Sequence, residues 1–177
     1  MAAAGEDRLR AIVISASMAA LGLVLPVAFH AVGLGSEFLP MLLPLLLNGF
    51  LVPLRWAALT GLAVPLLSAA VTGMPPLYPP VAVVISAEAA AMGTVAATVY
   101  GRRRRLWLAL LAAIAAGRMT AVLLTWVLAR VFLLPARTAS LAILIQGLPG
   151  VALQVAVVPL VVRSLSKRGG VLFSDER

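Results

Sequence analysis

Two charged side chains interrupt long apolar stretches of the sequence, and they are the first candidates for chemistry. Glu88 lies in the apolar run that follows a proline-rich stretch, and Arg118 lies near the middle of the next run. A lone charge in hydrocarbon costs about 3 kcal/mol on the translocon-insertion scale, so such groups pair or face a water-filled cavity. We therefore expect Glu88 and Arg118 to pair, directly or through a ligand. The alternative is an ion pair that only fixes helix packing.

Two glutamines in the last apolar run, Gln146 and Gln154, add neutral hydrogen-bonding groups. The residues between them include Gly147, Pro149 and Gly150, which should loosen a helix and free backbone carbonyls. We expect Gln146 to belong to a ligand site. For Gln154, an interhelical hydrogen bond competes with ligand contact.

Further candidates lie in two predicted loops. The stretch from Thr72 to Pro80 holds four prolines behind a glycine, and proline stops a helix, so this stretch predicts a loop of fixed shape. Thr72 could line a pocket beneath that loop, and Tyr78 could cover it as an amphipathic lid. His30 and Ser36 lie in the preceding loop. His30 could accept a proton, or it could simply be a polar residue at the membrane surface.

The composition is that of an integral membrane protein. Of the 177 residues, 63% are hydrophobic and 11% are charged, which leaves too few polar groups to cover a water-soluble surface. With no cysteine and a single histidine, we expect no metal site. We also expect no catalytic residues, because the sequence lacks the Gly-x-Ser-x-Gly motif of a hydrolase and its only histidine lies in a loop.

Six apolar segments predict an all-α membrane protein with six transmembrane helices in a single domain, residues 1–177. The segments run from about 9 to 29, 38 to 52, 56 to 71, 81 to 100, 106 to 134 and 139 to 165, with a tail over 166–177. A spanning helix needs about 20 apolar residues. The second and third segments are shorter and contain proline, which is typical of segments that line a binding site.

Lysine and arginine predict the orientation. With a cytoplasmic N-terminus, only Arg137 lies in an outer loop, and the cytoplasmic side carries Arg8, Arg10, Arg55, Arg102, Arg103, Arg104, Arg105, Arg163, Lys167, Arg168 and Arg177. By the positive-inside rule, both termini are then cytoplasmic. The run Arg102–Arg105 could also bind nucleic acid or anionic lipid, but a topological signal explains it more simply, and we expect no nucleic-acid partner.

Small residues recur every four positions in the first apolar segment. One series is Ala11, Ser15 and Ala19, and a second is Ala16 and Ala20. This spacing lets another helix approach closely. The neighbouring helix could belong to the same chain or to an external partner.

Several stretches, taken in order, carry a resemblance to a known family. They are FHAVGLGSEFLPMLLPLLL (29–47), LLSAAVTGMPPLYP (66–79), the segment around Glu88, the Ala-Gly-Arg that ends at Arg118 and the Pro-Gly-x-x-Leu-Gln that ends at Gln154. Together they resemble the substrate-binding S components of energy-coupling factor (ECF) vitamin transporters, over about residues 9–165.

The resemblance implies a six-helix protein of the prokaryotic cell membrane that captures a vitamin or related micronutrient beneath its outer loops. The implied partners are a transmembrane coupling subunit, which would dock on the Ala-x-x-x-Ala motif at Ala16 and Ala20, and two cytoplasmic ATPases. ATP would be used by those partners, and this chain has no Gly-x-x-x-x-Gly-Lys loop and no expected cofactor. Many relatives are expected to have histidine where Leu42 stands, which points to a different ligand here.

The competing interpretation is a stand-alone secondary transporter or channel for a small polar solute. Such a protein would need a relay of several intramembrane acids. Only Glu88 lies deep in an apolar run of this sequence, so the binding-subunit interpretation is preferred.

Overall fold

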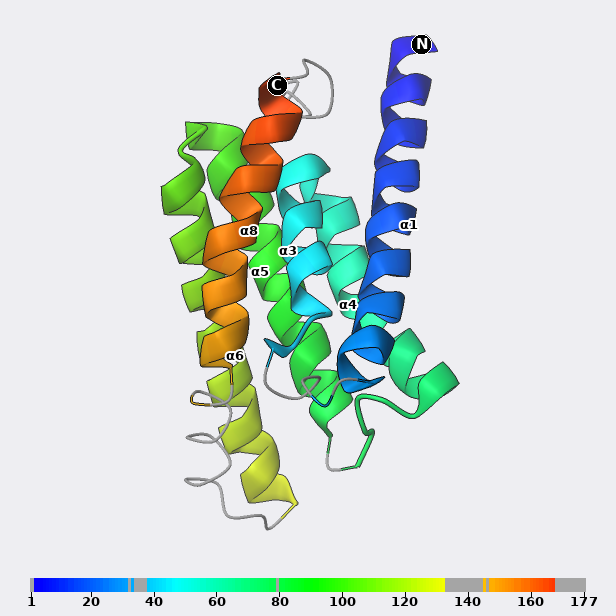
Figure 1. The fold of residues 1–177 in the computed structure, drawn as a ribbon, viewed down its shortest axis with the longest axis vertical. Helices are drawn as coiled ribbons and strands as arrows, with labels where there is room; N and C mark the ends of the chain where they lie inside the picture. Colours follow the sequence, from blue (N-terminus) through cyan, green and yellow to red (C-terminus); the bar gives the residue numbers. More distant parts are fainter. Residues whose placement is uncertain are drawn as a thin grey trace.

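The computed structural model describes residues 2–31, 33, 38–78, 80–132, 145 and 147–167. Over these residues the chain forms helices only (Figure 1). The helices with defined bounds are α1 (Ala2–Ala31), α3 (Leu42–Leu51), α4 (Leu54–Thr72), α5 (Val81–Arg103), α6 (Leu106–Val131) and α8 (Leu148–Lys167). The expected all-helical fold is confirmed for this part of the chain.

Five of these helices are long and apolar enough to cross a membrane, and α3, with ten residues, is not. The predicted second segment, 38–52, therefore contains a helix shorter than expected. Its limits have local causes: Leu39 has a positive φ of 43° before the helix, and Val52 is extended because Pro53 follows it. Nine of the ten residues of α3 are buried, so this short helix forms the centre of the bundle.

The other bounds lie close to those expected, with one large difference. Helix α1 begins at Ala2 rather than near residue 9. Its first turns carry Glu6, Asp7 and Arg8, which are exposed and polar, so hydropathy alone did not include them. Helix α8 is described from Leu148 onward, and the start of the predicted last segment, 139–144, lies outside the described residues.

Successive helices alternate in direction, so the start of α1 and the end of α8 lie at the same end of the bundle (Figure 1). We call this the basic end. It carries Arg8 and Arg10 of α1, Arg55 of α4, the run Arg102–Arg105 between α5 and α6, and Arg163 and Lys167 of α8. The charges that predicted the orientation are therefore clustered in space. Which side of the membrane this end faces stays a prediction.

Helix α5 packs against α3, α4 and α6, and its contacts with α3 and α4 are made through small residues. A Cβ atom on Gly49 of α3 would lie 2.6 Å from the carbonyl oxygen of Gly93, and one on Gly61 of α4 would lie 2.7 Å from the amide nitrogen of Ala90. The backbones of these helices thus touch with no side chain between them, as is common in membrane bundles.

Helix α1 lies at the edge of the bundle, against α3 and α4 (Figure 1). One series of small residues faces inward, since Ala11 and Ser15 are buried and Ser15 forms a 3.4 Å hydrogen bond with Asn48 of α3. The second series, Ala16 and Ala20, is exposed. The two four-residue series identified in the sequence therefore lie on different faces of α1.

Candidate ligand-binding site

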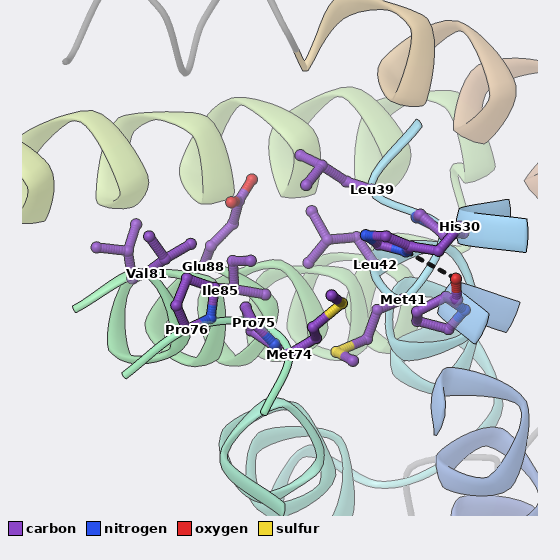
Figure 2. Close-up of a pocket in the computed structure, with 13 residues that line it drawn as sticks. His30, Leu39, Met41, Leu42, Met74, Pro75, Pro76, Val81, Ile85 and Glu88 are labelled. Atoms are coloured by element: carbon purple, nitrogen blue, oxygen red, sulfur yellow. Dashed lines mark hydrogen bonds between the residues drawn. The ribbon is translucent and has the colours of Figure 1, made fainter. Parts of the chain in front are cut away.

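A cavity of about 340 Å³ lies at the end of the bundle opposite the basic end. Its wall is formed by the end of α1 (Pro26 and His30), residues 39–42, residues 74–76 of the proline-rich loop and one face of α5 (Figure 2). The volume falls within the range of about 300–1,000 Å³ that is usual for small-molecule sites.

The face of α5 that lines the cavity follows helical spacing. Val81, Val84, Ile85 and Glu88 stand at positions i, i+3, i+4 and i+7, which form one stripe along a helix. Glu88 is the innermost of the four, about 10 Å along the helix axis from Val81. It is only 2% exposed, so the cavity ends on a buried carboxyl group.

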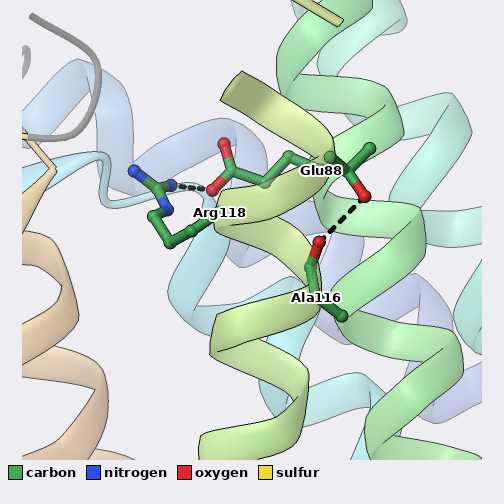
Figure 3. Close-up of polar contacts among 4 residues, drawn as sticks. Glu88, Ala116 and Arg118 are labelled. Atoms are coloured by element: carbon green, nitrogen blue, oxygen red, sulfur yellow. Dashed lines mark hydrogen bonds and ion pairs between the residues drawn. The ribbon is translucent and has the colours of Figure 1, made fainter. Parts of the chain in front are cut away.

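Glu88 forms an ion pair with Arg118 of α6, between Oε1 and Nη2 (Figure 3). The expected pairing is therefore direct. The Arg118 side chain is 12% exposed, and within the described part of the chain its Nε and Nη1 atoms have no hydrogen-bond partner. Gly117 brings α6 close enough for this contact, because a Cβ atom there would overlap the Met92 side chain of α5.

The two members of the Glu88–Arg118 ion pair differ in whether they line the cavity. Glu88 is part of its wall, whereas Arg118 is not. In Figure 2 the carboxylate of Glu88 points toward α6, the helix that carries Arg118. Arg118 therefore pairs with the Glu88 carboxylate from outside the described wall of the cavity, and ligand contact by Arg118 stays a prediction.

Hydrogen bonds at the end of α4 shape the loop that closes one side of the cavity. The Ser68 hydroxyl donates to the Met74 carbonyl at 2.6 Å, and the Met74 amide donates to the Thr72 hydroxyl at 3.2 Å. Gly73, with φ 74°, reverses the chain between them. Thr72 therefore does not line the cavity, but it fixes the position of Met74, which does.

His30 lies in the cavity wall near the end of α1. Its Nδ1 atom lies 2.8 Å from the carbonyl oxygen of Pro26 (Figure 2). A carbonyl only accepts hydrogen bonds, so Nδ1 is the donor, and Nε2 of the neutral ring is left as an acceptor.

The remaining predicted site residues lie elsewhere or cannot be placed. Tyr78 is 71% exposed, and its ring contacts Phe132 at a centroid distance of 5.8 Å. Gln154 is 2% exposed and does not line the cavity, and among the described residues its Oε1 has no hydrogen-bond partner. Gln146 and Ser36 lie outside the described residues. Contact of any of these with a ligand stays a prediction.

Sequence reasoning missed most of the wall. Met41, Leu42 and Met74 line the cavity, but in so apolar a chain nothing distinguishes an apolar wall residue from one that faces lipid. Leu42 is the exception. It directly follows the FLPM stretch, at a position where many relatives are expected to have histidine. Among the described residues, no three His, Cys, Asp or Glu side chains gather as a metal site would require.

Comparison with known proteins identifies the family. The family model for the substrate-specific component of ECF transporters matches residues 10–162. Searches of curated proteins and of solved structures gave no match. The matched range includes every residue of the cavity wall and both members of the Glu88–Arg118 pair. This chain therefore belongs to the family of substrate-specific components of ECF transporters.

Proposed function

We propose that this chain captures a vitamin or related micronutrient from outside the cell and delivers it inward as the membrane subunit of an ATP-driven importer. The observation that carries the proposal is the cavity, which ends on the buried Glu88 and lies at the end opposite the basic residues. Membership of the family supports the role of substrate-specific component.

The proposed orientation of the protein in the membrane follows from the distribution of its positive charges. The basic end gathers the Lys and Arg residues of four helices and their connections, and such residues accumulate on the cytoplasmic side of membrane proteins. With the basic end inside, the cavity faces outward, where a nutrient arrives. We place the protein in the prokaryotic cell membrane, with both termini cytoplasmic.

The proposed ligand contacts are Glu88 and His30, both in the cavity wall, with Arg118 holding the Glu88 carboxylate. Ser36 of the first predicted outer loop and Gln146 of the last apolar segment remain proposed contacts. A ligand that fills the cavity would displace water from a mostly apolar surface, and this supplies affinity. The buried carboxylate supplies orientation.

Transport driven by ATP needs partners, because this sequence contains no Gly-x-x-x-x-Gly-Lys phosphate-binding loop. We propose a transmembrane coupling subunit and two cytoplasmic ATPases as those partners, with ATP bound and hydrolysed there. The docking surface is the outward face of α1. There Ala16 and Ala20 are exposed, beside Val13 and Val24, which are also exposed. Small residues on this face would let a partner helix approach closely.

The test is to purify the full chain in detergent and to identify, by mass spectrometry, any small molecule that copurifies. We expect one vitamin-like compound at near-stoichiometric amount, and much less of it with Glu88→Gln. Glu6→Gln is the matched control, because Glu6 is an exposed carboxylate of α1 far from the cavity wall. Absence of any bound compound, together with proton-driven uptake by liposomes that contain this chain alone, would instead establish the stand-alone transporter.

A further inference from the structure

We infer that the cavity selects a compact ring compound that donates N–H hydrogen bonds, and that it rejects carboxylates of similar size. The inference deepens the proposed function and rests on it, since it concerns the chemistry of the ligand in the same cavity. It follows from the kinds of hydrogen-bonding group that the wall offers.

Among the described residues of the wall, side-chain donors are almost absent. Of the 13 described residues that line the cavity, only Glu88 and His30 have polar side chains, and four of the others are prolines. Proline lacks a backbone N–H as well. A ligand carboxylate needs several donors to replace its lost water, and these side chains provide none of them.

Backbone donors of the two helices that begin at the cavity are in part already used. The amide of Leu42, at the start of α3, donates to the Leu39 carbonyl at 2.9 Å. The amide of Ala82, in the first turn of α5, donates to the Pro76 carbonyl at 3.1 Å. At each of these two helix starts, one amide is therefore not available to an anionic ligand of the kind that binds at helix N-termini.

Both polar side chains among the described wall residues offer acceptor atoms. Glu88 pairs with Arg118 through Oε1 and has no other partner in the described part of the chain. An ionised carboxylate has about four lone-pair sites, so Glu88 retains capacity for a ligand donor. His30 uses Nδ1 to donate to Pro26 and keeps Nε2 of the neutral ring as an acceptor. A ligand with N–H groups satisfies both.

The charge of the cavity wall also favours a ligand that donates hydrogen bonds over a carboxylate. Among the described residues of the wall the only acidic group is that of Glu88, and the guanidinium of Arg118 lies behind it rather than in the wall. A ligand carboxylate would therefore reach the carboxylate of Glu88 before the guanidinium of Arg118. The thioethers of Met41 and Met74 and the proline rings instead form a surface suited to a flat ring. At about 340 Å³, the cavity lies at the small end of the usual range, which limits the ligand to a compact one.

The test compares two probes that share a ring and differ in one planar group: benzamidine, a cationic N–H donor, and benzoate, a carboxylate. Each is added to the full chain in nanodiscs, and the unfolding temperature is followed by tryptophan fluorescence. We expect benzamidine to raise it and benzoate at equal concentration to leave it unchanged. Glu88→Gln should weaken benzamidine binding about tenfold or more, as expected for loss of a charge-assisted hydrogen bond. His30→Phe, at an exposed position of the rim, gives a second variant that does not remove a buried charge, and it too should weaken benzamidine binding.

Three outcomes decide the matter. Stabilisation by benzoate equal to or greater than that by benzamidine overturns the inference, as does equal benzamidine binding by wild type and both variants. A copurifying compound that is a carboxylic acid without N–H donors overturns the inference but leaves the proposed function standing. If neither probe binds and no compound copurifies, the proposed function fails as well.

Discussion

Replacing Arg118 by methionine should destabilise the protein strongly, because it leaves the Glu88 carboxylate buried without a partner. Glu88 is 2% exposed and the Arg118 side chain 12%. Removal of one member of a buried ion pair costs about 3–5 kcal/mol of unfolding free energy. The cost of about 3 kcal/mol for a single charge in hydrocarbon is of the same size. We therefore expect Arg118→Met to lower stability by about 3–5 kcal/mol.

A double variant separates the loss of packing from the loss of the pair. In Glu88→Gln/Arg118→Met both charges are gone, and replacing a buried pair by neutral groups of similar volume is often close to neutral. The double variant should thus be more stable than Arg118→Met alone. The coupling energy between the two positions should reach about 2 kcal/mol, within the range for residues in contact.

The assay is reversible unfolding in mixed micelles, followed by the fluorescence of the three tryptophans. Arg130→Met is the matched control on the same helix. Arg130 is exposed and stacks on Trp126 at 4.7 Å, a contact that contributes at most about 1 kcal/mol. The reasoning fails if Arg118→Met is no more destabilising than Arg130→Met, or if the effects of the two single changes simply add in the double variant.

Two further predictions concern helix contacts. Gly117→Ala should lower stability by about 1–3 kcal/mol in the same unfolding assay, because its Cβ atom would overlap the buried Met92 side chain. Gly101→Ala, whose Cβ would meet nothing within 4 Å, should not be destabilising, and equal losses in the two variants would contradict this contact. Ala16→Trp or Ala20→Trp should abolish copurification with the coupling subunit while the bound compound is retained. Leu59→Trp, at an exposed position of α4, is the control, and assembly that survives both alanine changes would remove α1 as the docking face.

The parts of the site that could be predicted from the sequence are those where the chemistry of a residue allows few structural arrangements. A carboxylate and a guanidinium in an apolar chain have little else to pair with, so the contact between Glu88 and Arg118 was foreseeable. Prolines have no amide hydrogen, so the loop after Thr72 was foreseeable too. Both features follow from the chemistry of single residues.

Other features depend on which face of a helix turns inward, and uniform apolar sequence carries little of that information. Ala19 and Ala20 are neighbours, yet only the series that contains Ala19 packs within the chain. Tyr78 looked suited to cover a pocket, but its ring contacts Phe132 instead. Thr72 was expected in a pocket wall, and its hydroxyl instead bonds the backbone of Met74, because a short side chain at a helix end competes for local backbone groups.

The backbone contacts of α5 also bear on how new specificities could evolve in this scaffold. Where Gly49 meets Gly93 and Gly61 meets Ala90, there is no side chain that could shrink or rotate to let α5 shift. A descendant protein that adopts a larger nutrient must therefore make room elsewhere. The wall positions that can be replaced are residues 39–42 and 74–76. They lie between helices, except Leu42, which is the first residue of α3. Sequence variation among relatives of this chain should therefore concentrate at these positions.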